Sequence, residues 1–351
     1  MQIKHEKNYN IELLRIISML MILFLHYLNQ GKVLELTDKT SMSFYLIWII
    51  EAFCHVSVNL YMFISGYYLG VKEYSWRRFI SFYTTIFFYS ACISVFCFLT
   101  NISELNFENI IKVFPIIGSK SNWYVTCYAA ILLVSPLLNI IIRSIRQDVF
   151  KRILIIQFIL FSVYPTIGYC SDPFIVKKGY SILWFSFVYL LAGYIRKYSV
   201  CLSCRYSVFM MVSIGILPIC KFWLPAVEKS MYAYNSIPVF IASYAIFVMV
   251  VNNKRTAFST ITPWVTFLGK TSFGVFFIHS FVLIRDKLWI FMGSTKYINS
   301  LYQVVHGLFC IVFIYIICSI IDGFRLMLFD KLGVNKTVNQ LSKYLDKAFQ
   351  L

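Results

Sequence analysis

Ionisable side chains stand inside several long apolar runs of this sequence. The run 11–28 contains Glu12, Arg15 and His26. Ionisable side chains inside a membrane span are costly, and they usually face a cavity or a partner. Arginine binds phosphate and carboxylate groups, and histidine exchanges protons near neutral pH. These three residues are therefore the first candidates for chemistry.

Helical geometry places the two basic side chains of this run on one face. His26 follows Arg15 by eleven residues, which is roughly three full turns and a rise of roughly 16 Å. Glu12 precedes Arg15 by three residues, a spacing that allows an ion pair. Alternatively, the three residues only anchor the two ends of a membrane helix.

Polar residues recur every four positions in a second apolar run. Glu51, His55 and Asn59 form one stripe along one face of a helix. The same run continues through Ser65 and Gly66, and a glycine there allows another helix to approach closely. The stripe is either a hydrogen-bonded seam between helices or the wall of a functional cavity.

A third apolar run opens with Lys270 and carries a serine and a histidine. Ser272 and His279 are seven residues apart and therefore lie on the same side of a helix. His279 is either a hydrogen-bonded residue of the core or a weaker functional candidate, and both alternatives stay open.

The composition indicates that membrane helices position these residues. The chain has 351 residues, of which 60% are hydrophobic and 13% are charged, whereas soluble domains carry about 25% charged residues. The net charge of +17 fits basic residues that flank membrane spans and face anionic lipid, so nucleic acid is not an expected partner. The ten cysteines lie mostly in apolar runs, and the one CxxC pair, Cys201 and Cys204, has no second pair and no histidine near it, so no metal is expected.

The apolar runs predict an all-α, polytopic membrane helical bundle with about ten transmembrane helices, forming a single domain over residues 1–351. Lysine and arginine are more frequent in the segments that lie on the same side of the membrane as the N-terminus. This bias predicts cytoplasmic N- and C-termini and an even number of spans. Residues 1–10 and 326–351 are then cytoplasmic tails, and the second is an amphipathic segment on the membrane surface. The predicted spans are 11–28, 44–70, 79–99, 122–142, 153–170, 181–195, 206–224, 233–251, 270–290 and 302–324.

With these residues in place, the chain resembles the acyltransferase-3 family of integral membrane acyltransferases. Residues 10–27 look like the family's first helix, in which an acidic residue and an arginine are followed by a histidine at a fixed distance. Residues 59–67 resemble its Ser-Gly-aromatic segment, and residues 123–125 and 135–139 resemble its fourth-span region. Residues 268–279 resemble its late helix that ends in histidine. The four segments occur in order along nearly the whole chain.

The resemblance implies an O-acetyltransferase of the kind that modifies bacterial surface polysaccharides. An acetyl group would move from acetyl-CoA, a co-substrate rather than a bound cofactor, to a hydroxyl of a cell-surface or lipid-linked polysaccharide. His26 would act as the base, because a hydroxyl needs one to become a nucleophile. Arg15 would bind a phosphate or the thioester region of the donor, and Glu12 would hold Arg15 in position.

The remaining candidates divide between acceptor and donor. Three aromatic residues near the predicted outer end of the fourth span, Trp123, Tyr124 and Tyr128, would stack on a sugar ring, or else belong to an interfacial aromatic belt. Many family members carry spaced arginines and a proline after the Ser-Gly segment, whereas this chain has two adjacent arginines and no nearby proline. The acceptor or supporting candidates are Glu51, His55, Asn59, Ser65, Trp123, Tyr124 and His279, and the donor-binding candidates are Arg15, Arg77, Arg78 and Lys270.

The expected location is the plasma (inner) membrane, as a multi-pass protein whose partners are an acyl-CoA donor, a glycan acceptor and membrane lipid. The alternative is a transporter or flippase of a lipid-linked glycan, or a glycan polymerase. Transporters often contain internal repeats and paired Gly/Pro-broken helices, and neither is evident in this sequence. Polymerases usually have a large outer loop, whereas the predicted outer loops are short. The acceptor sugar and the acyl chain stay open.

Overall fold

The part of the chain that the computed structural model describes contains helices and no strand. It covers residues 8–102, 122–167, 172–224, 230–253 and 261–349. The predicted all-α class is therefore confirmed. The helices are α1 (Tyr9–Asn29), α2 (Val33–Leu36), α3 (Met42–Cys54), α4 (Ser57–Leu69), α5 (Arg77–Leu99), α7 (Trp123–Ser144), α8 (Gln147–Phe158), α9 (Tyr164–Ile167), α10 (Ile182–Tyr198), α11 (Cys204–Val212), α12 (Ile216–Trp223), α14 (Ile237–Asn252), α15 (Thr262–Ser280), α16 (Arg285–Phe291), α17 (Tyr302–Lys331) and α18 (Val334–Ala348).

Seven helical segments of the described chain are long and apolar enough to cross a membrane. An eighth arises if α15 and α16 form one broken span, since they meet at a bend of 90°. The predicted span 270–290 is therefore wrong as a continuous helix. The seven segments are Tyr9–Asn29, Met42–Leu69, Arg77–Leu99, Trp123–Ser144, Gln147–Ile167, Arg205–Trp223 and Tyr302–Lys331.

Two other predicted spans coincide with shorter helices. Spans 181–195 and 233–251 overlap α10 and α14, which have 17 and 16 residues. Crossing a bilayer usually takes about 20 residues, and these two helices are at or below the short end of the range, about 17. The structure thus supports seven or eight long spans, and the count of ten stays a prediction. The last residues of span 153–170, and part of each predicted tail, lie outside the described residues.

The second predicted span is interrupted where its polar stripe lies. Helix α3 ends at Cys54 and α4 begins at Ser57, so His55 stands at the junction. Its ring nitrogen Nδ1 lies 2.9 Å from the carbonyl oxygen of Glu51. The stripe is consequently divided between two helices.

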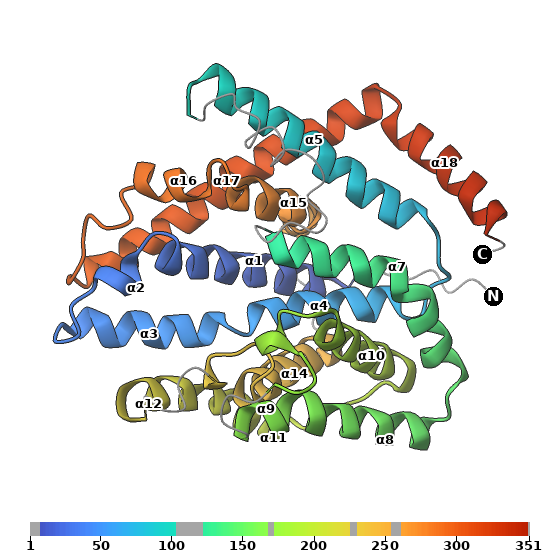
Figure 1. Cartoon of the computed structure of the whole chain (residues 1–351), viewed down its shortest axis with the longest axis horizontal. Helices are drawn as coiled ribbons and strands as arrows, with labels where there is room; N and C mark the ends of the chain where they lie inside the picture. The colour runs from blue at the N-terminus through green and yellow to red at the C-terminus, as the bar shows by residue number, and fades with distance from the viewer. Residues whose placement is uncertain (1–7, 103–121, 168–171, 225–229, 254–260, 350–351) are drawn as a thin grey trace.

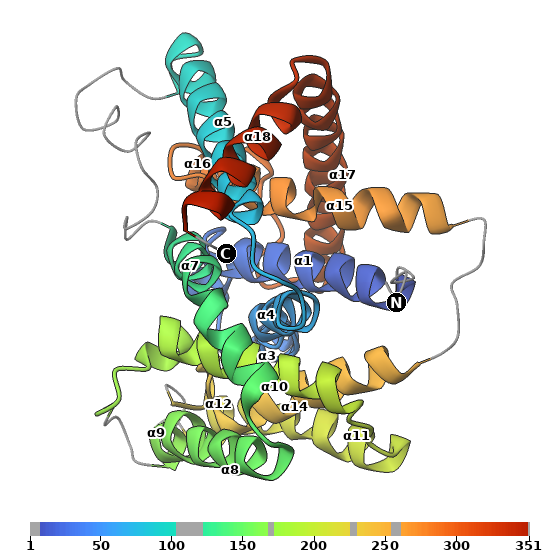
Figure 2. The same cartoon turned by 90° about the vertical axis from the view of Figure 1, so that its right-hand side faces the viewer.

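Helices α1 and α4 occupy the centre of the bundle. Figures 1 and 2 show α5, α15 and α17 on one side of this pair and α8, α10, α11 and α14 on the other. Helix α1 packs against α4, α15 and α17, and α4 packs against α10 and α14. The candidate residues of α1 therefore face helices that come from distant parts of the chain.

The approach of α4 to α10 depends on a glycine, as the sequence predicts. A Cβ atom added at Gly66 would lie 2.7 Å from the carbonyl oxygen of Tyr189 and 2.9 Å from the Cβ atom of Ala192. Both distances are too short for any larger residue. Gly66 therefore lets the backbones of the two helices touch.

The first turn of α1 and the helix α18 lie on the same side of the bundle (Figure 1). Helix α17 continues to Lys331, so the first residues of the predicted tail 326–351 belong to that helix. Residues 334–348 of the tail form α18, which packs beside α5. The Asp346 carboxylate accepts hydrogen bonds from the Trp76 backbone N–H and the Ser75 hydroxyl, both at 2.9 Å. The cytoplasmic location of both termini and the even number of crossings stay predictions.

Candidate active site

A cavity of about 720 Å³ lies between α1, α4, α5, α7 and α15. This volume is typical of a site for a small-molecule ligand. We call it the cationic cavity because four basic residues line it. The lining residues used below are Arg15, Met19, Ile22, Tyr61, Ser65, Arg77, Arg78, Tyr124, Tyr128, Lys270, Ser272, Phe273 and Phe276.

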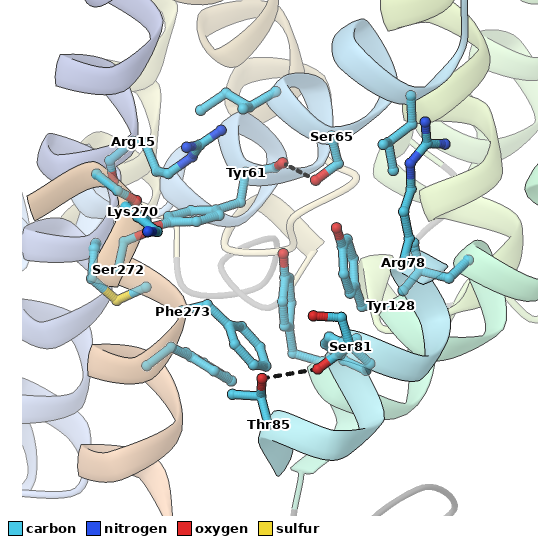
Figure 3. A pocket seen from close by; sticks show the side chains of 18 of the residues that line it. Arg15, Tyr61, Ser65, Arg78, Ser81, Thr85, Tyr128, Lys270, Ser272 and Phe273 are labelled. Carbon is cyan, nitrogen blue, oxygen red and sulfur yellow. Dashed lines mark hydrogen bonds between the residues drawn. The ribbon is translucent and has the colours of Figure 1, made fainter. Parts of the chain in front are cut away.

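The four basic side chains reach the cationic cavity from opposite walls. Figure 3 shows Arg15 and Lys270 on one side and Arg78 on the other. Arg77 and Lys270 are exposed, whereas Arg15 and Arg78 are half-buried. Guanidinium groups bind phosphate through paired N–H donors. The cavity thus combines an apolar interior with groups suited to a multiply charged anion.

The ion pair allowed by the sequence spacing is present in α1. The Nη1 atom of Arg15 lies 2.7 Å from Oε2 of Glu12. Glu12 is buried, and it packs where Gly269 of α15 leaves room for it. The hydroxyl of Tyr61 donates a hydrogen bond of 3.0 Å to the carbonyl oxygen of Arg15. Glu12 thus holds the guanidinium of Arg15 at the wall of the cavity.

A second cavity, of about 100 Å³, adjoins the first and contains His26. We call it the histidine cavity. Its polar lining differs from that of the cationic cavity, because neutral amides and one guanidinium replace the group of four cations. Its lining residues are Ile22, Leu25, His26, Gln30, Val58, Asn122, Trp123, Tyr124, Tyr234, Phe276, Ser280 and Arg285.

Two histidines from helices that are far apart in the sequence contact each other beside this cavity. Nδ1 of His26 lies 2.9 Å from Nε2 of His279. Nδ1 of His279 lies 2.6 Å from the carbonyl oxygen of Val275. A carbonyl only accepts, so in a pair of neutral rings His279 carries its proton on Nδ1 and accepts at Nε2. His26 must then donate from Nδ1, which leaves the lone pair on its Nε2 available for a proton.

A sequence model of an acyltransferase domain family matches residues 8–322, which is nearly the whole chain. The chain belongs to this family. The resemblance noted in the sequence is thereby confirmed, and with the apolar helices it makes the protein a multi-pass membrane acyltransferase. No curated protein and no solved structure matches the chain.

The acyltransferase brings most of the predicted residues to the two cavities. The cationic cavity is lined by Ser65 and by all four donor candidates, which are Arg15, Arg77, Arg78 and Lys270. The histidine cavity is lined by His26 and Trp123. Tyr124 lines both. His279 contacts His26 directly, which the sequence left open.

The polar stripe of the acyltransferase lines neither of these two cavities. Asn59 donates to the carbonyl oxygen of Tyr234 at 2.8 Å and to Oγ of Ser243 at 3.3 Å, and its Oδ1 accepts from Trp184 Nε1 at 2.9 Å. These contacts favour the interpretation of a seam between helices at this position. Oε1 of Glu51 accepts from Asn29 at 2.9 Å. A role for Glu51 and His55 in acceptor binding stays a prediction.

Arg285 is a site residue that the sequence reasoning missed. The chain bends by 90° between α15 and α16, and this bend brings Arg285 to the same small cavity as His26. Irregular backbone within a membrane is tolerated where it is buried in protein or lines a cavity. Phe281 and Leu283 in the break are buried. The sequence did place a basic residue at the outer end of a predicted span, but no feature of the sequence indicated that the helix is interrupted there.

Proposed function

We propose that this membrane acyltransferase moves an acetyl group from acetyl-CoA to a hydroxyl of a cell-surface or lipid-linked polysaccharide. The observation that carries the proposal is the adjacency of a cavity with four cationic groups and a cavity with His26. The donor occupies the cationic cavity, with its phosphates at the rim near Arg77 and Arg78. The acceptor enters from the opposite side of the membrane. We assign the plasma (inner) membrane, because acetyl-CoA is a cytoplasmic donor.

In the proposed transfer, His26 acts in the tautomer that has its proton on Nδ1 and a free lone pair on Nε2. Nε2 of His26 takes the proton of the acceptor hydroxyl as its oxygen attacks the carbonyl carbon of the thioester. The carbon–sulfur bond breaks, and the proton passes from His26 to the leaving thiolate. His279 acts as a positioning residue, since its Nε2 accepts from His26 Nδ1 and keeps Nε2 of His26 free for the proton.

Release of coenzyme A tests the proposed activity. Purified protein in detergent is expected to release free thiol from acetyl-CoA only when polysaccharide is present, and the acetyl group should appear as an ester on the glycan. Thiol titration and mass spectrometry of the glycan measure both products. If no thiol is released while proteoliposomes carry lipid-linked glycan across the bilayer, the protein is a transporter and the proposal fails.

Replacing His279 tests its positioning role. We expect His279→Phe to lower kcat about 10- to 100-fold, because His26 loses the acceptor that selects its tautomer. The KM for acetyl-CoA should change little, since the donor contacts lie in the other cavity. His279→Gln, whose amide oxygen can accept from His26, should recover part of kcat. Equal kcat per folded molecule in all three proteins would remove His279 from the mechanism.

A further inference from the structure

Three helices each present one side chain that lines both cavities. On α1, Met19 lines only the cationic cavity, Ile22 lines both cavities, and His26 lines only the histidine cavity. These positions succeed one another by roughly one turn along a single face. Ile22 therefore marks the level at which the two cavities meet.

Helices α7 and α15 repeat this order. On α7, Tyr128 lines the cationic cavity, Tyr124 lines both and Trp123 lines the histidine cavity. The numbering decreases here because α7 crosses in the direction opposite to α1, as the predicted alternation of spans requires.

On α15 the order again increases. Ser272 and Phe273 line the cationic cavity, Phe276 lines both and Ser280 lines the histidine cavity. Ile22, Tyr124 and Phe276 are thus the only residues common to both linings among the described residues. We call these three side chains the shared wall.

Aromatic packing holds two of the three side chains of the shared wall, Tyr124 and Phe276. The ring centroid of Tyr124 lies 5.3 Å from that of Phe276, 5.6 Å from that of Phe185 and 6.0 Å from that of Tyr128, the last nearly parallel at 7°. Phe276 also meets the ring of His279 edge-on at 6.0 Å. Interiors packed in this way respond to a change of a single methylene. The shared wall is therefore a firm boundary next to the two histidines.

We infer that the shared wall sets the length of the acyl chain that the enzyme transfers. This inference rests on the proposed function. The thioester carbonyl has to approach a hydroxyl beside His26, so the acyl chain lies at the shared wall during transfer. The histidine cavity beyond it measures about 100 Å³ and must also admit part of the acceptor. A two-carbon group fits this space, whereas longer chains meet Ile22, Tyr124 and Phe276.

Acyl-CoA donors of increasing length test the inference with one fixed polysaccharide acceptor. We expect kcat/KM of the wild-type enzyme to fall about 10- to 200-fold for each methylene that meets the wall, from acetyl-CoA through propionyl-CoA to butyryl-CoA. Phe276→Leu should raise kcat/KM for butyryl-CoA relative to acetyl-CoA by about tenfold or more. Ile22→Val, a smaller change on another helix, should shift the same ratio in the same direction. It serves as the second variant if Phe276→Leu does not fold.

Phe277→Leu is the matched control. Phe277 is the next residue of α15 and is fully buried, but it lines neither of the two cavities. Its variant should keep the wild-type preference for acetyl-CoA. Equal use of acetyl-CoA and butyryl-CoA by the wild type would overturn the inference and leave the proposed function standing, because the chain would then point back into the cationic cavity. Absence of turnover with every acyl-CoA would instead reject the proposed function, and this inference with it.

Discussion

His26→Gln is expected to reduce acyl transfer by about 10²- to 10⁴-fold, which is the usual contribution of a general base. Glutamine can keep a hydrogen bond to His279, but its amide oxygen does not take up a proton near neutral pH. The change should therefore spare folding and membrane insertion. Initial rates of coenzyme A release at saturating donor and acceptor give kcat directly.

The control for this prediction is another histidine of a membrane helix. His306 of α17 lies 2.9 Å from the Tyr27 hydroxyl and lines neither of the two cavities. His306→Gln makes the same chemical change and should keep most of the activity. Wild-type rates of glycan acetylation by the His26→Gln protein would show that another group serves as the base.

Arg15→Gln is expected to lower kcat/KM for acetyl-CoA by about 10- to 150-fold. A hydrogen bond to a charged group contributes about 1.5–3 kcal/mol, and its loss appears as that factor. The loss should lie mainly in KM, because Arg15 lines the cationic cavity, where we propose that the donor binds, and not the histidine cavity. Steady-state kinetics with varied acetyl-CoA at saturating acceptor separates the two constants.

Two controls decide what Arg15 binds. Acetylpantetheine has the thioester without the nucleotide phosphates, so its use should fall only if Arg15 contacts the thioester region. The single variant also leaves the buried carboxylate of Glu12 without its ion-pair partner. The double variant Glu12→Gln/Arg15→Gln removes that charge, and its loss of kcat/KM should match that of Arg15→Gln. If the double variant regains wild-type kinetics, Arg15 has no contact with the donor.

The sequence determined the features that depend on one helix at a time. Apolar runs identified the seven long apolar helices, since a span needs only length and hydrophobicity. The spacing of Glu12 and Arg15 anticipated their ion pair, because neighbours three residues apart meet on any α-helix. Gly66 anticipated a close helix approach for an equally local reason. The order of four segments along the chain indicated the family.

Only the tertiary structure decided which helix faces meet. His26 and His279 are 253 residues apart, so no periodic pattern could pair them. The stripe that contains Asn59 had two open interpretations. The hydrogen bonds of Asn59 with Trp184 and Tyr234, on other parts of the chain, favour a seam between helices at that position. The 90° bend after α15 likewise has no glycine or proline to announce it.

The shared wall, too, could be located only from the tertiary structure. Ile22, Tyr124 and Phe276 are ordinary apolar residues within apolar helices, and nothing local distinguishes them from their neighbours. Their proposed role arises because α1, α7 and α15 pack so that these three side chains line both cavities. The rise and twist of a helix fix which residues share a face, and the sequence determines those. Packing between distant segments fixes what each face meets, and here it places the cationic cavity next to the histidine cavity.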